Sequence, residues 1–233
     1  LLEGQLVGPG NAELEAMLAS AASIQMRVEL LTDLGILVAA SGAADEGRAH
    51  VAEALRLLEE FGLLGRISEN RRMSAWIERL VGDYDAEIAF FDLAVEALQI
   101  APPLAAASAY GVAIESSRSL ALAKVGRVAE ARAGAERVEF IEAAGWPDRL
   151  RLQAWARILA AEGRDADAAT RAQEVETVAT DIPFPFARAE ALVESGVVAF
   201  MVGDDVAAER RARKALEVAL AKESLAHQRK AEA

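Results

Sequence analysis

The feature that most constrains the fold of this chain is an internal repeat of about forty residues. Five segments share one pattern: an apolar stretch that ends at glycine, one or two polar or small residues, and a second stretch with small residues at every third or fourth position. The glycines are spaced 40, 44, 37 and 40 residues apart. They are Gly42, Gly82, Gly126, Gly163 and Gly203. Such a period predicts stacked supersecondary units, as in a repeat protein.

Each repeat is predicted to be a pair of helices joined by a tight turn. Glycine suits the turn because a helix that stops and reverses needs a left-handed residue at its end. Acidic residues that favour the start of a helix follow the glycines, at Asp83, Asp85, Glu130, Asp165 and Asp204. Prolines mark the boundary between one pair and the next, at Pro102, Pro103, Pro147, Pro183 and Pro185. No stretch alternates with period two, so no strand is predicted.

These signals give a set of boundaries. First helices are predicted near 25–40, 69–81, 106–125, 149–162 and 186–202, and second helices near 45–61, 84–99, 128–144, 165–180 and 205–225. The organisation expected is a leader or linker over 1–10, a remnant helix over 11–24 with Asn11 as its N-cap, a helical solenoid over 25–225 and a tail over 226–233. Because residue 1 is Leu, the chain is expected to be a piece of a longer polypeptide; a proteolysed or renumbered start is the alternative.

Composition narrows the class of protein. The hydrophobic fraction is 53% but aromatics are only 5%, so helices are expected to pack closely through small side chains. The absence of cysteine excludes disulfides and thiolate metal sites and favours a cytoplasmic location. A net charge of −12 argues against direct binding of nucleic acid or anionic lipid. No apolar run reaches the roughly 18–20 residues that span a membrane.

One repeat carries a family resemblance. The sequence G-D-Y-D-A-E-I-A-F-F-D-L-A, from Gly82 to Ala94, resembles the second half of a tetratricopeptide repeat. Tyr84, Phe91 and Ala94 match the family's tyrosine, phenylalanine and second alanine. Five residues after the turn glycine, however, the family has a small residue and this repeat has Glu87. The other repeats fill that place with Gly47, Ala131, Ala168 and Ala208.

The resemblance implies an all-α fold, a right-handed α-α superhelix of about five TPR-like hairpins. The repeats are longer than the family's usual thirty-four residues. In this they are similar to the helical-repeat regions of bacterial ATPase-linked transcriptional regulators of the maltose-activator type and of class III nucleotide cyclases. The function implied is a protein-interaction or scaffolding module of a larger signalling or transcription-regulatory protein. The alternative is an effector-sensing domain that binds a small metabolite in its concave groove.

The sequence offers no constellation typical of catalysis. The two histidines, His50 and His227, lie far apart along the repeats, and neither has partners at metal-ligand spacing. G-P-G at Gly8 lacks the Lys and Ser or Thr of a phosphate-binding loop. No catalytic residue, metal or cofactor is therefore predicted, and the chain is not expected to be an enzyme.

A cluster of basic residues suggests a binding surface. Arg66, Arg71, Arg72 and Arg79 lie near only Glu69 and Glu78 in sequence, with Trp76 among them. Counted back from the turn glycines, seven residues are predicted to line the concave face: Arg72, Trp76, Arg79, Ser116, Gln153, Arg157 and Glu194. Arg and Trp side chains there would suit an acidic protein or peptide. The alternative is that the arginines pair with neighbouring acids and Trp76 packs between hairpins.

Overall fold

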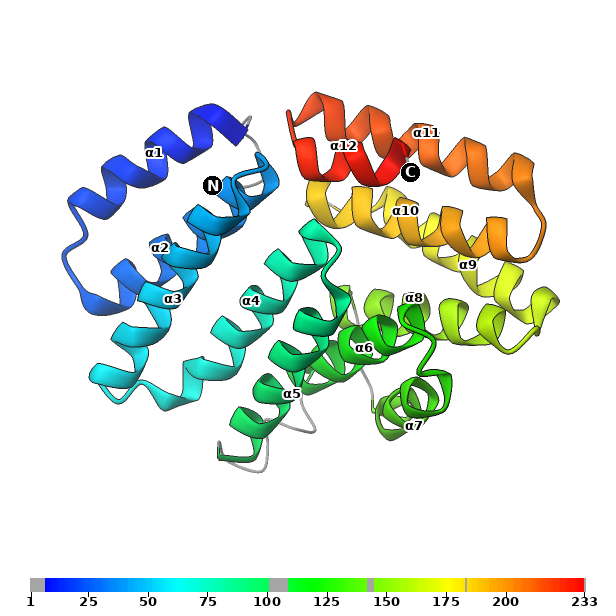
Figure 1. The fold of residues 1–233 in the computed structure, drawn as a ribbon, viewed down its shortest axis with the longest axis horizontal. Coiled ribbons are helices and arrows are strands. Elements are labelled where there is room, and N and C mark those ends of the chain that lie inside the picture. Colours follow the sequence, from blue (N-terminus) through cyan, green and yellow to red (C-terminus); the bar gives the residue numbers. More distant parts are fainter. Residues whose placement is uncertain (1–6, 101–108, 142–144, 183, 233) are drawn as a thin grey trace. The chain divides into compact units, whose positions relative to one another are not determined.

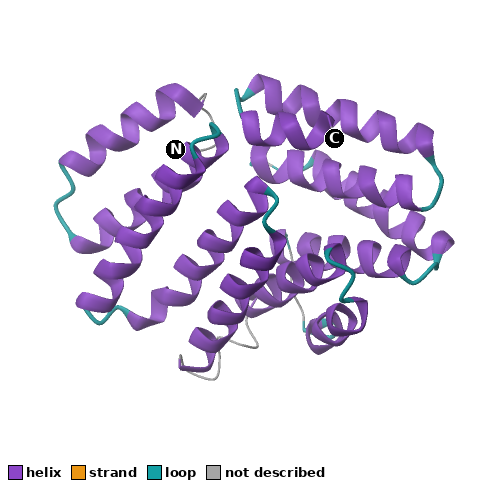
Figure 2. Cartoon of the chain, in the orientation of Figure 1, coloured by secondary structure: helices purple, strands orange, loops and turns teal. Residues whose placement is uncertain are grey.

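The computed structural model describes residues 7–100, 109–141, 145–182 and 184–232, and within these ranges it contains helices and no strand (Figures 1 and 2). The all-α fold class predicted from the sequence is confirmed. The chain divides into two compact units. The first comprises residues 1–102 with 220–226, and the second comprises 103–219 with 227–233.

The first unit is built from helices that pack in sequence order. Helix α1 packs on α2, α2 pairs with α3, and α4 pairs with α5, while α2 and α3 both contact α4. A short 3-10 helix, η1, precedes α4 and contacts α3, α4 and α5. The bounds are α1 Val7–Ala19, α2 Ile24–Ala40, α3 Ala44–Glu60, η1 Leu64–Arg66, α4 Ile67–Val81 and α5 Tyr84–Ile100.

The second unit continues the same arrangement. Helix α6 pairs with α7 and also packs on α8, α8 pairs with α9, and α10 packs on both α8 and α9. Its core is made mainly of alanine, valine and leucine, as composition predicted. The bounds are α6 Ala109–Lys124, α7 Val128–Val138, α8 Trp146–Ala161, α9 Asp165–Thr180 and α10 Pro185–Met201. Helices α11 Asp205–Ala221 and α12 Leu225–Glu232 belong to this unit except for residues 220–221 and 225–226, which are part of the first.

All five turn glycines predicted from the repeat adopt the left-handed conformation. Their φ angles lie between +73° and +100°. Two of the acidic residues expected after them act as N-caps, because Asp83 accepts a hydrogen bond from the Ala86 amide and Asp204 from the Ala207 amide, each at 3.0 Å. Side-chain caps of this kind satisfy amide groups that the first helical turn leaves unpaired. The glycines therefore set where each hairpin reverses.

Small residues sit where the paired helices cross. A Cβ atom added at Gly47 on α3 would lie 2.5 Å from the carbonyl oxygen of Gly35 on α2 and 3.0 Å from the Ala39 Cβ. The two backbones are thus in direct contact, and the equivalent positions Ala131 and Ala168 are fully buried. Ala208, expected at the same place in the last hairpin, is only half-buried, while its neighbour Ala207 is 6% exposed.

Several boundaries differ from the prediction. Helix α1 begins at Val7 rather than after Asn11, and residues 225–232 form α12 where a tail was expected. Helix α7 ends at Val138 instead of near residue 144, and the Arg151 guanidinium donates to the carbonyls of residues 138, 139 and 141 at 3.0–3.3 Å, which satisfies acceptors at this end of the helix. Pro147 and Pro185 begin helices, as predicted. Residues 1–6 of the leader, Pro102, Pro103 and Pro183 lie outside the described residues.

Candidate functional site

The seven residues predicted to bind a ligand fall in both units. Arg72, Trp76 and Arg79 all lie on α4 of the first unit. The other four lie on three helices of the second unit: Ser116 on α6, Gln153 and Arg157 on α8, and Glu194 on α10. Within the second unit, α8 packs against both α6 and α10. The seven residues are therefore divided between the two units, three in the first and four in the second.

Each arginine of the predicted basic cluster has a carboxylate partner. Arg66 binds Glu29 at 2.6 Å and Arg72 binds Glu69 at 2.6 Å. Arg71 lies 3.9 Å from Glu59, and Arg79 donates to Glu87 at 2.6 Å. Trp76 is half-buried. The arginines are therefore paired with acids, as in the alternative interpretation of the sequence. Three of the four acids, Glu29, Glu59 and Glu87, lie on helices other than α4.

The exposure expected for most of the seven residues is wrong. Arg79 is 5% exposed, Glu194 is 5%, Gln153 is 2% and Ser116 is fully buried. Arg157 is half-buried, and the Arg72 side chain is 17% exposed. Glu194 forms an ion pair with Lys124 of α6. Four of the seven side chains, those of Arg79, Ser116, Gln153 and Glu194, are therefore covered by protein, and the other three are half-buried.

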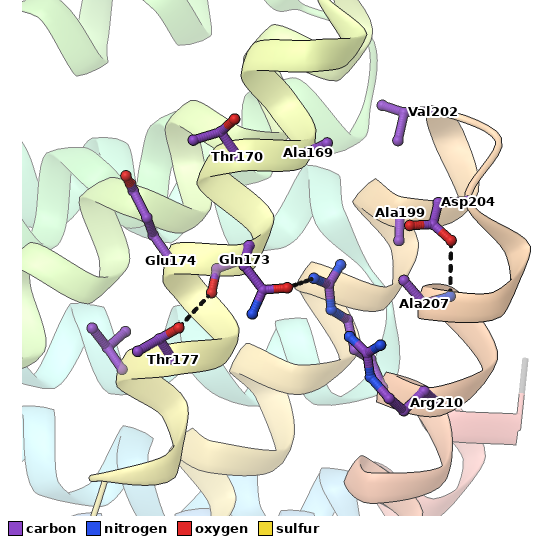
Figure 3. Close-up of a pocket in the computed structure, with 12 residues that line it drawn as sticks. Ala169, Thr170, Gln173, Glu174, Thr177, Ala199, Val202, Asp204, Ala207 and Arg210 are labelled. Carbon is purple, nitrogen blue, oxygen red and sulfur yellow. Dashed lines mark hydrogen bonds between the residues drawn. The ribbon is translucent and has the colours of Figure 1, made fainter.

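An open groove lies elsewhere in the second unit. Its volume is about 660 Å³, and its walls come from α9 on one side and from the end of α10 and the start of α11 on the other (Figure 3). Most of the lining is apolar. None of the seven predicted residues contributes to it. The lining residues are Ala169, Thr170, Gln173, Glu174, Thr177, Val178, Ala199, Val202, Asp204, Ala207, Arg210 and Arg211.

The groove stays open because its walls carry short side chains. Ala169 and Thr170 on α9 face Ala199, Val202 and Ala207 across the opening (Figure 3). The threonine hydroxyls are turned back to their own helix, since Thr170 donates to the Ala166 carbonyl at 2.9 Å. A threonine that bonds its own backbone presents its methyl group outward. The walls thus behave as apolar surface.

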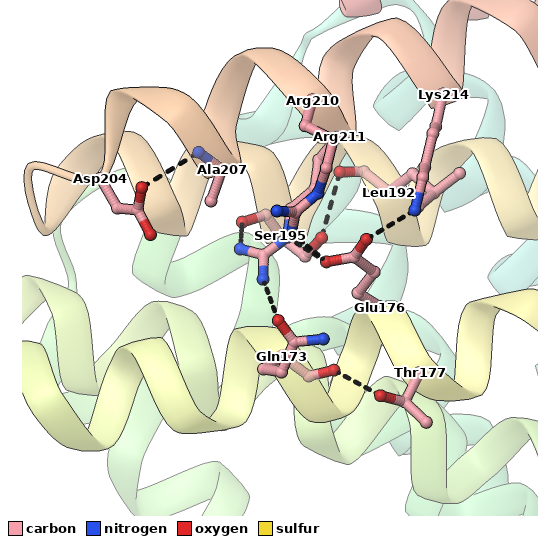
Figure 4. Close-up of polar contacts among 10 residues, drawn as sticks. All are labelled: Gln173, Glu176, Thr177, Leu192, Ser195, Asp204, Ala207, Arg210, Arg211 and Lys214. Atoms are coloured by element: carbon pink, nitrogen blue, oxygen red, sulfur yellow. Dashed lines mark hydrogen bonds and ion pairs between the residues drawn. The ribbon is translucent and has the colours of Figure 1, made fainter.

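A cluster of cations lies at one end of the groove, around Glu176 of α9 (Figure 4). Arg210 and Arg211 each donate to one carboxylate oxygen of Glu176, and Lys214 donates to the other, all at 2.8 Å. Arg211 also donates to the Gln173 side chain at 3.2 Å and to the Ser195 carbonyl at 3.0 Å. Three cations therefore share one carboxylate, and two positive charges are not neutralised within the cluster.

Burial divides the cluster into a fixed part and an accessible part. The side chains of Arg211 and Glu176 are only 4% and 8% exposed, whereas those of Arg210 and Lys214 are 48% and 47% exposed. Burial by itself would raise the pKa of Glu176. Hydrogen bonds from Lys214, Arg211 and Arg210 outweigh it and lower the pKa from 4.5 to about 2. The carboxylate is thus ionised at neutral pH, and Arg210 and Lys214 can reach a ligand.

Exposed apolar side chains flank the groove in sequence. Phe200 is 69% exposed and Val206 is 78% exposed, and both lie between residues that line the walls. Large exposed apolar side chains near a groove favour an interaction surface. A sequence signal for this region existed in the run R-R-A-R-K from Arg210 to Lys214, which is a dense basic segment in an acidic chain. Its position on a second helix kept it outside the predicted face.

No cluster suited to a metal ion occurs in the part of the chain that the structure describes, where no three acidic, histidine or cysteine side chains converge. Within the same described ranges, no helix is both long enough and apolar enough to cross a membrane. No family model matches the chain, and no curated protein matches it in a sequence search.

Proposed function

We propose that this chain is a protein-interaction module that docks an apolar, acidic peptide segment in the groove between α9 and α11. The single observation that supports it is the open groove of about 660 Å³ beside the incompletely neutralised cluster of Arg210, Arg211 and Lys214. Apolar side chains of the peptide would fill the groove. An Asp or Glu of the peptide would accept hydrogen bonds from Arg210 and Lys214.

The form of the groove favours a peptide over a metabolite. A small ligand is usually enclosed, with 70–90% of its surface covered. Here the opening runs between two helices and remains accessible to solvent, which suits a segment of a partner protein (Figure 3). An amphipathic helix laid along such a groove is a common recognition mode. The charge of the cluster would orient the segment, because its acidic end would lie toward Arg210.

The finer fold assignment belongs to the same proposal. The regular glycine turns and the small residues at helix crossings support TPR-like hairpins, and the right-handed superhelix of about five of them stays a prediction. The resemblance to bacterial regulators adds that the module would serve a larger signalling or transcription-regulatory protein. The seven residues predicted from sequence, from Arg72 to Glu194, likewise remain a predicted binding set that awaits a ligand.

A peptide-display selection on the full chain would test the docking groove. Random twelve-residue peptides should yield binders that combine large apolar residues with Asp or Glu. Ala169→Trp fills the groove from an exposed position on α9 and should weaken the selected peptides by about tenfold or more. Ala133→Trp makes the same change at an exposed position on α7, outside the groove, and should leave affinity unchanged. Equal binding by the Ala169→Trp variant would refute this groove as the docking site.

A further inference from the structure

The cation cluster beside the groove carries more positive charge than one carboxylate of a peptide would neutralise. Arg210, Arg211 and Lys214 all donate to the carboxylate of Glu176, so three positive charges less one negative leave a net charge of +2. An Asp or Glu of the docked segment would remove one of these two charges and leave the other. An anion with two negative charges would neutralise both.

Two members of the cluster keep donors that a ligand can reach. The side chains of Arg210 and Lys214 are about half exposed, and among the described residues each donates only to Glu176. A guanidinium has five N–H donors and an ammonium has three, so most of these donors remain for a ligand. Arg211 differs, because it is buried and its donors are used within the protein.

One small anion can reach both exposed cations. Arg210 and Lys214 are four residues apart on α11, so they lie on the same face of the helix. Their nitrogens already donate to the two oxygens of a single carboxylate, that of Glu176, each at 2.8 Å (Figure 4). A phosphate ester is also compact, carries a charge of about −1.5 to −2 at pH 7 and offers three acceptor oxygens. Arginine can bind such a group through two hydrogen bonds at once.

The other carboxylates near the cluster do not cancel its charge. Asp204, at the start of α11, accepts a hydrogen bond from the Ala207 amide. Glu217 follows Lys214 by three residues, but it is exposed, so solvent and salt screen its effect. Two further carboxylates are neutralised on their own helices, Glu174 by Arg171 at 2.7 Å and Glu209 by Arg213 at 2.6 Å.

We infer that the segment docked in the groove carries a phosphoserine or phosphothreonine, whose phosphate is bound by Arg210 and Lys214. The apolar side chains next to the phosphorylated residue fill the groove, which is lined by Ala169, Ala199 and Val202. A free phosphate would use the cations and leave these apolar walls empty. The inference rests on the docking function proposed above and adds its regulation, because phosphorylation of the partner would strengthen the complex.

Titration calorimetry on the full chain with three matched peptides tests the phosphate. A peptide from the display selection is synthesised with Glu, phosphoserine or Ser at the acidic position whose replacement by Ser costs the most affinity. The phosphoserine form should bind about tenfold more tightly than the Glu form, because it neutralises a second charge and offers a third acceptor. Lys214→Gln should remove most of that difference. Arg213→Gln removes a cation of α11 that pairs with Glu209, and it should preserve the difference.

The pH dependence of binding identifies the charge state of the ligand. The second pKa of phosphoserine is about 6, so the group changes from a monoanion to a dianion between about pH 5 and pH 7.5. Affinity for the phosphoserine peptide should therefore rise about threefold to tenfold over this range. Affinity for the Glu peptide should change little, because a Glu side chain ionises at about pH 4.3. The pKa of Glu176 is lowered to about 2, so the cluster itself does not titrate in this window.

The outcomes distinguish this inference from the docking function. If the Glu peptide binds as tightly as the phosphoserine peptide, or if both show the same pH dependence, the phosphate inference is wrong and the docking groove stands. If inorganic phosphate alone binds as tightly as the phosphoserine peptide, the cluster needs no peptide and the inference is also wrong. A second library with a fixed phosphoserine is screened in parallel. Binders from that library alone support the inference, whereas the absence of binders from both libraries refutes both proposals.

Discussion

Arg79 on α4 and Glu87 on α5 form a buried ion pair at the crossing of their hairpin, with Arg79 Nε donating to Glu87 Oε1 at 2.6 Å. The side chains are 6% and 0% exposed. Counted from the turn glycine, the same two places hold Ala39 and Gly47 in the first hairpin, where they are in contact. A pair of opposite charges thus replaces a pair of small residues. This explains why Glu87 departs from the tetratricopeptide pattern, which has a small residue there.

The first prediction concerns this buried ion pair between Arg79 and Glu87. Glu87→Ala should destabilise the chain by about 3–5 kcal/mol, because it leaves the Arg79 guanidinium buried without its carboxylate. The double variant Arg79→Ala with Glu87→Ala should lose less than the single one. It recreates the alanine pair found at residues 160 and 168, although it also removes the Arg79 contact with the Phe91 ring at 5.7 Å. Chemical denaturation of the two single variants, Glu87→Ala and Arg79→Ala, and of the double variant measures the coupling. Additive losses would contradict it.

The second prediction concerns the close crossings. Ala168 is fully buried between α8 and α9, so Ala168→Leu should overpack the hairpin and cost about 1–3 kcal/mol. Ala166→Leu makes the same change at an exposed site on the same helix and should cost far less. Ala208→Leu should fall between the two, because that residue is half-buried. Equal unfolding free energies for the Ala166 and Ala168 variants would show that the repeat register is misplaced.

The features that the sequence predicts correctly and those that it does not predict have separate physical causes. A tight turn needs a residue that adopts a left-handed conformation, such as Gly82, and a close helix crossing needs a residue without a side chain, such as Gly47. Both needs can be recognised from the residue type alone. Ion pairs depend on which helices meet. Arg79 is separated from Glu87 by one turn, yet Arg66 pairs with Glu29 across 37 positions of sequence. The distance in sequence between two charged residues therefore does not predict whether they form an ion pair.

The candidate groove was missed for a related reason. Its walls are defined by short side chains such as Ala169 and Ala199, and alanine is common throughout this chain. Whether such residues leave a groove or pack tightly depends on how far apart α9 and α11 lie, which periodicity does not determine. Ala168 and Ala169 are neighbours in sequence, but the first is in the core and the second lines the groove.

The third prediction is a pH dependence set by His227. This side chain is 1% exposed and stacks on Phe186 with 5.4 Å between ring centroids. Burial lowers its pKa from 6.5 to about 4; Glu190 nearby favours the charged form, and Lys230 opposes it. The unfolded chain therefore binds a proton at a higher pH than the folded chain. Stability should fall as the pH drops from about 6.5 to about 4.

A variant isolates that contribution from the carboxylates that titrate in the same range. His227→Phe keeps a ring that can stack on Phe186 and has no proton to bind. The difference in unfolding free energy between the wild type and the variant should change with pH between about 6.5 and 4 and stay level above that window. A difference that is constant across the whole range would mean that His227 titrates normally when folded.

The fourth prediction concerns the carboxylate that fixes the cation cluster. Glu176→Gln should destabilise the chain by about 3 kcal/mol, because Arg211 is 4% exposed and would lose its charged partner. Glu209→Gln removes an exposed carboxylate that pairs with Arg213 on the same helix, and it should change stability by less than about 1 kcal/mol. Since the pKa of Glu176 is lowered to about 2, its contribution should persist above about pH 4.5 and be lost as the pH falls toward 2. A Glu176→Gln variant as stable as the Glu209→Gln variant would show that Arg211 does not depend on that carboxylate.

The last prediction separates the groove of the second unit from the surface predicted on α4. Arg210→Glu should weaken a selected acidic peptide by about tenfold or more, since it replaces a half-exposed cation beside the groove with a like charge. Arg213→Glu lies three residues away on α11, is 68% exposed and contacts Glu209 rather than Glu176, so it should weaken binding only slightly. Arg72→Ala and Trp76→Ala should have no effect on a peptide held by the groove. Added salt should weaken binding at either place, because the side chains of Arg210 and Arg72 are both partly exposed to solvent. If Arg72→Ala and Trp76→Ala lower the affinity while Arg210→Glu does not, the peptide binds the surface on α4 that the sequence predicted.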